Sequence, residues 1–151
     1  MELKSVKEGV AMKKLYFVFL IFILSVFVSG CVEKKVDPKT LTSPDKRALY
    51  DLMVARGHAL NAKDMDLFRQ IYTKDSPELK WIKDTGIPMW EENGMNFNDP
   101  SLKRISIMGD DAAASFSLSG SNKFGTSFIY RVEVLYVKED SKWKIESTGA
   151  R

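Results

Sequence analysis

The sequence predicts an α+β domain in which three N-terminal helices pack on a curved antiparallel sheet of about four strands. Up to about residue 92, apolar residues recur every three or four positions, as on one face of an amphipathic helix. From about residue 102 the spacing changes to two, as in half-buried strands joined by short turns. A third observation, a short apolar segment that ends at Cys31, separates a leader from this domain.

Ser43 and Pro44 predict the start of the first helix, because a hydroxyl caps unpaired N–H groups and proline needs no N–H partner at the first position. Its stripe is mostly apolar but includes one arginine: Leu49, Leu52, Met53, Arg56, Ala59 and Leu60. The segment 61–63 ends this helix, and Asp64 caps a second, short one. The apolar face of the second helix is formed by Met65, Phe68, Ile71 and Tyr72.

A third helix is expected from Pro77 to Glu92, interrupted or kinked near Pro88, because proline lacks the N–H that a helix interior requires. Its large apolar residues are Leu79, Trp81, Ile82, Met89 and Trp90. Trp81 and Trp90 are nine residues apart, a spacing that does not by itself place them on one face of a kinked helix.

Four strands are expected at about 102–108, 112–119, 126–138 and 142–146, with turns at 109–111, 120–122 and 139–141. One face of the resulting sheet is apolar and consists of Ile105, Ile107, Ala112, Ala114, Phe116, Leu118, Phe128, Tyr130, Val132, Val134, Tyr136, Trp143 and Ile145. The other face is mixed and includes Ser115, Ser117, Ser119, Arg131, Glu133 and Leu135. Helices are expected to cover the apolar face.

Three passages of the chain carry a family resemblance. ALNAKDMDLF at 59–68 joins the first two helices, IYTKD at 71–75 ends the second, and KWKI at 142–145 closes the last hairpin. In this order and spacing they resemble the NTF2-like (SnoaL-like, cystatin-like) superfamily. The resemblance implies a cone whose mouth lies between sheet and helices. Members include isomerases, dehydratases and cyclases as well as non-catalytic binding or assembly modules, so the fold does not select the function.

The leader is typical of a secretory signal peptide: Lys13 and Lys14, then the apolar run 15–28, then small residues. Val28-Ser29-Gly30-Cys31 is similar to the lipobox of prokaryotic lipoproteins, in which diacylglycerol is attached to the cysteine and the chain is cut just before it. We therefore expect a signal peptide at 1–30, of which 1–11 precede a better start at Met12. The alternative is an uncleaved helix, although a membrane span needs about 17–25 apolar residues.

A lipid on Cys31 sets the expected organisation and location. The polar segment 31–42 would tether the domain, 43–149, to the membrane. The domain would face the extracytoplasmic side of the cell membrane or the outer membrane, between which the sequence does not distinguish. One cysteine allows no internal disulfide, and no cluster has metal-ligand or cofactor-binding spacing. Without the leader the net charge is about +1. No basic stripe remains to bind nucleic acid, so nucleic acid is not expected as a partner.

The strand residues expected to line the cone include no carboxylate and no histidine, so we expect an apolar, carboxylate-free cone. Aromatic side chains combine apolar area with a polar tip and suit a pocket mouth, although ordinary core packing explains any one of them as well. The candidates for a ligand pocket are Tyr50, Tyr72, Trp81, Trp90, Phe116, Tyr130 and Tyr136.

These features favour a non-catalytic, membrane-anchored envelope lipoprotein that binds a small apolar ligand or a partner protein. A structural module of an envelope assembly, which uses the outer sheet face or an edge strand, is the first alternative. The family resemblance also implies a homodimer through the outer sheet face, although a solvated face explains its mixed composition as well. An isomerase- or dehydratase-like enzyme is the second, with Tyr50 or His58, the sole histidine, as proton carrier.

Overall fold

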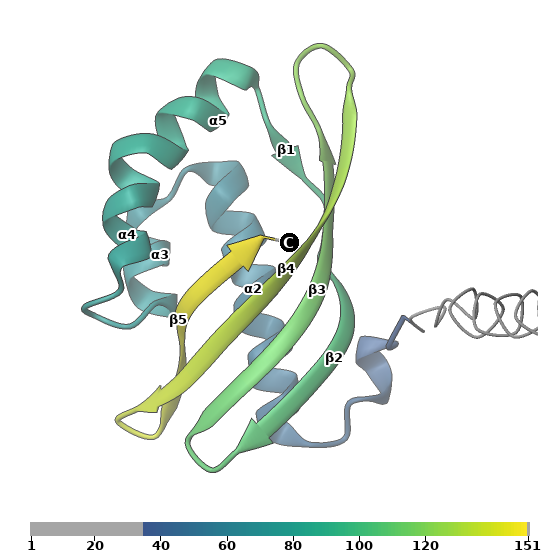
Figure 1. Ribbon diagram of the computed structural model, residues 1–151, viewed down its shortest axis with the longest axis vertical. Coiled ribbons are helices and arrows are strands. Elements are labelled where there is room, and N and C mark those ends of the chain that lie inside the picture. The colour runs from purple at the N-terminus through teal and green to yellow at the C-terminus, as the bar shows by residue number, and fades with distance from the viewer. Residues whose placement is uncertain (1–34, 151) are drawn as a thin grey trace, which may run out of the picture. The chain divides into compact units, whose positions relative to one another are not determined.

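Helices lie along one face of a curled antiparallel sheet (Figure 1). The computed structural model describes residues 35–150, and the predicted leader and Cys31 lie outside them. The helical elements are η1 (Pro38–Thr40), α2 (Pro44–Ala62), α3 (Met65–Ile71), α4 (Pro77–Trp81), η2 (Ile82–Gly86) and α5 (Ile87–Asn93). The strands are β1 (Asn96–Phe97), β2 (Ser101–Met108), β3 (Asp111–Ser121), β4 (Ser127–Glu139) and β5 (Lys142–Ala150). The predicted α+β class is confirmed.

The ends of the first two helices are set by local chemistry. The Ser43 hydroxyl accepts a hydrogen bond from the Lys46 N–H and caps α2. Lys63 ends α2 in the left-handed conformation, with φ 55°. Asp64 then accepts hydrogen bonds from the backbone N–H groups of the next helix and caps α3. These caps were readable from the sequence because each involves residues close together in the chain.

The third helical segment is continuous from α4 to α5, but its middle turn, η2, is a π-helix. In this turn the Ile87 N–H donates to the Ile82 carbonyl, five residues back instead of four. The wider turn fits Pro88, because in a regular helix its ring would crowd the carbonyl four residues before it. Gly94 ends the segment with φ 56°. The interruption predicted near Pro88 is therefore a change of helix type rather than a break.

The central strand of the sheet is β3. It pairs with β4 on one side, and on the other side with β2 and, at its end, with β1. The turn predicted at 120–122 is wrong, since β3 continues to Ser121 and the chain turns at 122–126. Gly120 lies where β1 passes closest: a Cβ there would be 2.1 Å from the Asn96 carbonyl oxygen.

The last strand, β5, contains a β-bulge and extends beyond its predicted end at residue 146. Tyr136 pairs with Ile145 but Leu135 pairs with Ser147, so Glu146 is an extra residue. After the bulge Thr148 lies opposite Val134, which is fully buried on the inner face of the sheet. The bulge therefore places Thr148 on the inner face.

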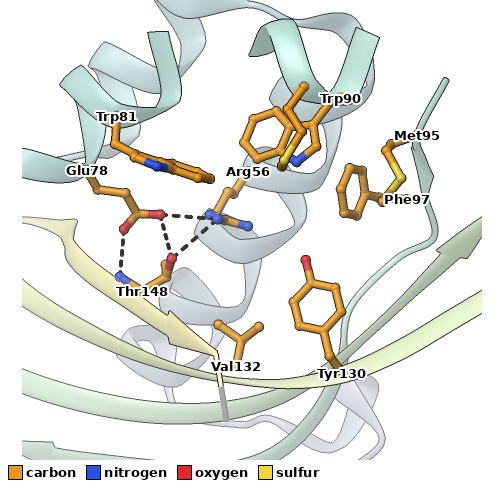
Figure 2. Close-up of a pocket in the computed structure, with 10 residues that line it drawn as sticks. Arg56, Glu78, Trp81, Trp90, Met95, Phe97, Tyr130, Val132 and Thr148 are labelled. Atoms are coloured by element: carbon orange, nitrogen blue, oxygen red, sulfur yellow. Dashed lines mark hydrogen bonds and ion pairs between the residues drawn. The ribbon is translucent and has the colours of Figure 1, made fainter. Parts of the chain in front are cut away.

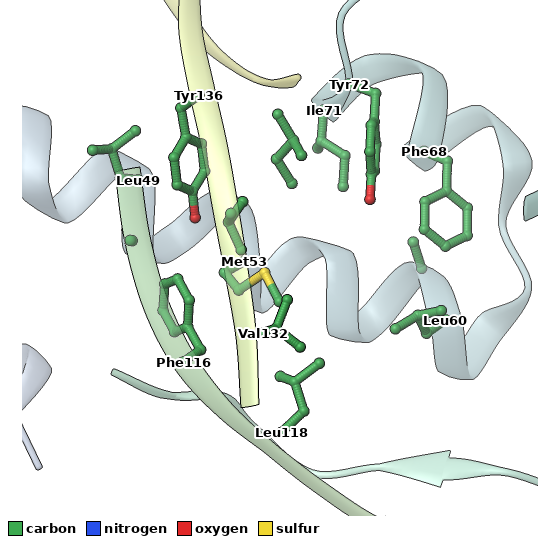
Figure 3. Packing of buried hydrophobic residues seen from close by; sticks show 14 of the residues in the cluster. Leu49, Met53, Leu60, Phe68, Ile71, Tyr72, Phe116, Leu118, Val132 and Tyr136 are labelled. Atoms are coloured by element: carbon green, nitrogen blue, oxygen red, sulfur yellow. The ribbon is translucent and has the colours of Figure 1, made fainter. Parts of the chain in front are cut away.

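The main core lies between α2 and the inner face of β3 and β4 (Figure 3). The helix contributes Leu49, Met53 and Leu60 to it. The strands contribute Phe116, Leu118, Val132, Val134 and Tyr136. Ser115, predicted on the outer face, is also buried. The two-residue alternation thus identified the inner face of the sheet but not every buried position.

Part of the predicted tether belongs to the domain. The Val36 N–H donates to the Leu102 carbonyl of β2 at 3.0 Å, and Val36 and Leu41 pack against the core. Arg47 of α2 donates to the Pro38 carbonyl at 3.2 Å. The folded unit therefore begins at about Val36 rather than at residue 43. Among residues 35–150, no helix is both long and apolar enough to cross a membrane.

Candidate ligand pocket

A pocket of about 640 Å³ opens between the helical segment α4–α5 and the strands β4 and β5 (Figure 2). Its volume lies within the range of about 300–1,000 Å³ that is usual for small-molecule sites. Ten residues line it: Arg56, Glu78, Trp81, Met89, Trp90, Met95, Phe97, Tyr130, Val132 and Thr148. Most of these side chains are apolar, and the polar ones gather on the wall where α2, α4 and β5 meet.

The aromatic wall depends on the π-helical turn. In a regular helix nine residues make about two and a half turns, which would put Trp81 and Trp90 on opposite faces. The longer turn of η2 rotates Trp90 toward Trp81, and their ring centroids lie 5.8 Å apart in an edge-to-face arrangement. Trp90 in turn meets Phe97 at 6.1 Å, again edge to face. The three rings form one continuous apolar surface.

The polar wall is a hydrogen-bonded network centred on Arg56 and Glu78. Arg56 Nε donates to the Tyr72 hydroxyl at 2.7 Å, and Nη2 donates to Glu78 Oε1 at 3.2 Å and to Thr148 Oγ1 at 3.3 Å. Glu78 Oε1 also accepts from the hydroxyls of Tyr72, at 2.9 Å, and Thr148, at 2.5 Å. Glu78 Oε2 accepts from the Thr148 N–H at 2.7 Å. These hydrogen bonds join α2, α4 and β5, which are far apart in the sequence.

Burial and neighbouring charges shift the pKa values of Arg56 and Tyr72 in this network. Arg56 is only 6% exposed. Burial acts to lower the pKa of Arg56, but Tyr72 and Glu78 beside it outweigh that effect, and the pKa lies above its usual value. Burial raises the pKa of Tyr72, so its hydroxyl stays protonated and can donate to Glu78. Arg56 and Glu78 form an ion pair, and their charges cancel.

One polar group in this wall lacks a partner within the described residues. Arg56 Nη1 is buried and makes no hydrogen bond there. Tyr130 also lines the pocket, and burial raises the pKa of its hydroxyl above the usual value. Figure 2 shows the guanidinium group of Arg56 and the hydroxyl of Tyr130 facing the same space, below Trp90. The wall can therefore donate hydrogen bonds into the pocket.

No protein-family model matches the sequence, and a comparison with curated proteins finds no match. Among solved structures, the chain is similar to an NTF2-like protein of unknown function from Shewanella oneidensis, with a TM-score of 0.57 and 15% identity over 70% of this chain and 98% of that one. It is similar to an NTF2-like protein from Cytophaga hutchinsonii, with a TM-score of 0.55 and 14% identity over 72% and 98%. A third, an uncharacterized protein with a cystatin-like fold from Caulobacter vibrioides, gives a TM-score of 0.54 and 14% identity over 72% and 89%.

The fold is NTF2-like. At these identities the likeness concerns the fold alone, and the predicted resemblance is confirmed at that level.

The NTF2-like cone brings together only some of the aromatic candidates. Trp81, Trp90 and Tyr130 line the pocket. Tyr72 lies behind its polar wall and bonds to Arg56 and Glu78. The remaining three do not line it: Phe116 and Tyr136 are fully buried in the main core, and Tyr50 is half-buried with its ring centroid 6.5 Å from that of Phe116.

The expectation of a carboxylate-free cone is wrong, because Glu78 lines the pocket. That expectation was based on the inward-facing strand residues alone. Glu78 instead comes from helix α4. His58 is exposed on α2 and does not line the pocket. It is therefore not positioned to move a proton there. Within residues 35–150 no three His, Cys or carboxylate side chains are grouped as metal ligands.

The polar wall was missed by the sequence analysis, although one of its members had a signal. Arg56 interrupts an otherwise apolar helical stripe, and arginine in such a place needs a partner when it is buried. Glu78 gave no signal, since a carboxylate in the first turn of a helix is common. Thr148 gave none either, because its inward position depends on the bulge at Glu146.

Proposed function

We propose that this protein is a membrane-anchored envelope lipoprotein whose NTF2-like domain binds a small, largely apolar ligand without converting it. The observation that carries the proposal is the pocket of about 640 Å³, in which Trp81, Trp90 and Phe97 form an apolar wall. Such a wall with a few convergent polar groups is typical of small-molecule sites.

The state of Glu78 supports binding rather than catalysis. A general base needs an oxygen that can reach the proton of its substrate. Both oxygens of Glu78 already accept hydrogen bonds, from Arg56, Tyr72 and Thr148. A carboxylate held in this way is suited to fix the pocket wall in place.

The uncharged dye N-phenyl-1-naphthylamine tests the pocket. We expect saturable binding with one dye per chain, measured by its fluorescence. Trp81→Ala should weaken binding about tenfold by removing part of the apolar wall. Phe124→Ala is the matched control, because Phe124 is also an exposed aromatic, at 73%, but lies on the β3–β4 turn outside the pocket.

Two results would contradict the proposal. One is dye binding that does not saturate or that falls equally in both variants. The other is a screen in which the purified protein converts a compound and loses that activity on Trp81→Ala.

The lipid anchor rests on the sequence alone, from the apolar run 15–28 to Cys31. Mass spectrometry of the protein extracted from membranes should find an N-terminus at Cys31 that carries acyl groups. Cys31→Ala should abolish the acylation and release the chain from the membrane fraction. A chain that retains residues 15–30 would instead support the uncleaved helix.

A second candidate function is an assembly module that pairs with a second copy through the outer sheet face. It is favoured by two apolar side chains that β4 exposes there, Ile129 at 78% and Leu135 at 47%. Sedimentation should then find a dimer that Ile129→Lys dissociates. A monomeric wild-type chain would exclude this candidate.

A further inference from the structure

We propose that the pocket selects an uncharged ligand that presents one acceptor oxygen, a carbonyl, to Arg56 Nη1 and lays a flat apolar body against the tryptophans. This inference rests on the proposed function and specifies its ligand class. It is carried by Arg56, a buried charged side chain that lines the pocket and whose Nη1 makes no hydrogen bond within the described residues.

The first step concerns the donors of Arg56. A guanidinium group has five N–H donors. Nε and Nη2 are bound to Tyr72, Glu78 and Thr148, which fixes the group in one orientation. Nη1 makes no hydrogen bond within the described residues. A buried donor without an acceptor is unfavourable, so a ligand that supplies an acceptor at this point is favoured over one that does not.

The second step concerns charge. Arg56 and Glu78 are the only charged side chains among the described residues that line the pocket, and they already form an ion pair. Their side chains are 7% and 13% exposed, so solvent screens them little. A carboxylate ligand would bring a second negative charge next to Glu78 with a single cation to serve both. A neutral carbonyl takes the Nη1 donor and leaves the pair balanced.

The third step concerns the rest of the ligand. The Tyr130 hydroxyl faces the same space and can donate to the second lone pair of the same oxygen (Figure 2). Trp81, Trp90 and Phe97 then offer ring faces and edges to a flat apolar body. The polar and apolar walls together match a ketone, amide or ester attached to a ring system.

Three probes of similar size and shape distinguish the contributions of an acceptor oxygen and of negative charge. They are the ketone 2-acetylnaphthalene, the hydrocarbon 2-ethylnaphthalene and the carboxylate 2-naphthoate. Their dissociation constants are measured by ligand-observed NMR with the purified full chain. We expect the ketone to bind at least about tenfold more tightly than the hydrocarbon, because a hydrogen bond to a charged donor is among the stronger ones. The carboxylate should bind more weakly than the ketone.

Arg56→Lys tests the donor. The lysine keeps the charge and can still reach Tyr72 and Glu78, but it has no second nitrogen to offer to the pocket. We expect the ketone to lose its advantage over the hydrocarbon, so that the two probes bind this variant with equal affinity. Arg47→Lys is the matched control, because Arg47 lies exposed on the same helix and outside the pocket.

The order of the three dissociation constants in the wild-type protein tests the inference even if Arg56→Lys does not fold. A second measurement is the infrared carbonyl band of bound 2-acetylnaphthalene, which two hydrogen bonds should shift to lower frequency. Equal affinity for ketone and hydrocarbon, or tightest binding of the carboxylate, would overturn the inference and leave the proposed function standing. Absence of binding by all three probes would overturn the proposed function itself.

Discussion

Gly86 shows how one residue can decide the form of the pocket. A Cβ at this position would lie 2.8 Å from the Trp90 ring and 3.1 Å from the Trp81 ring. These distances are shorter than normal van der Waals contact, so the two rings approach each other only because Gly86 has no side chain. Gly57, on α2, provides a contrast, since a Cβ there would meet nothing within 4 Å.

We expect Gly86→Ala to lower the free energy of unfolding by about 1–2 kcal/mol, because overpacking exceeds the gain in helix propensity. Gly57→Ala should raise it by about 0.5–1 kcal/mol, since there only the propensity changes. Urea unfolding measures both, and near-UV circular dichroism should change in Gly86→Ala alone. Equal stabilisation by both substitutions would show that the tryptophan rings can move aside at no cost.

Three elements meet at the ion pair between Arg56 and Glu78. Arg56 comes from α2, Glu78 from α4, and Thr148 of β5 donates to Glu78 through both its N–H and its hydroxyl. Removing one partner of such a pair leaves the other charge buried without compensation. The same contacts therefore hold the helices on the sheet and form the polar wall of the pocket.

A double-mutant cycle at this pair should give a large coupling energy. Arg56→Met alone and Glu78→Leu alone are each expected to cost about 3–5 kcal/mol, because the other charge stays buried without its partner. Arg56→Met combined with Glu78→Leu should cost much less than the two single changes added together. The exposed pair Asp66–Arg69, whose side chains are 83% and 57% exposed, is the control and should couple by less than about 1 kcal/mol. Similar coupling in both pairs would refute this role of the buried pair.

At the scale of the whole molecule, buried tyrosines make the stability of the fold depend on pH. The four tyrosines in the described part of the chain, Tyr50, Tyr72, Tyr130 and Tyr136, all have a pKa raised by burial. Burial disfavours the phenolate, so the folded state holds these protons more tightly than the unfolded state. The resulting stability is present below the unfolded pKa of about 10 and is lost as the pH rises through the folded values.

We therefore expect the protein to unfold in alkali, with its stability falling steadily above about pH 10. Phenolate absorbance and far-UV circular dichroism, recorded on one sample, should show Tyr72 and Tyr136 ionising together with the loss of helix. Complete ionisation near pH 10 with unchanged circular dichroism would contradict this expectation.

Much of the fold could be predicted because it is encoded locally. Ser43 and Asp64 cap their helices through hydrogen bonds to residues two or three positions away. The inner faces of β3 and β4 follow from alternation alone. The polar wall could not be predicted in this way, since Glu78 and Thr148 are 70 residues apart. The contact between Trp81 and Trp90 could not be predicted either, because the π-helical turn between them breaks the 3.6-residue periodicity of a regular helix.

The bulge in β5 lets the strand carry one extra residue without changing which side chains face the pocket. Glu146 is exposed, its side chain does not line the pocket, and it has no partner on β4. Deleting it would remove the bulge and leave Thr148 two positions after Ile145, still opposite Val134 and on the inner face. Among relatives of this fold, β5 could thus gain or lose one residue at the surface while the polar wall of the pocket stays the same.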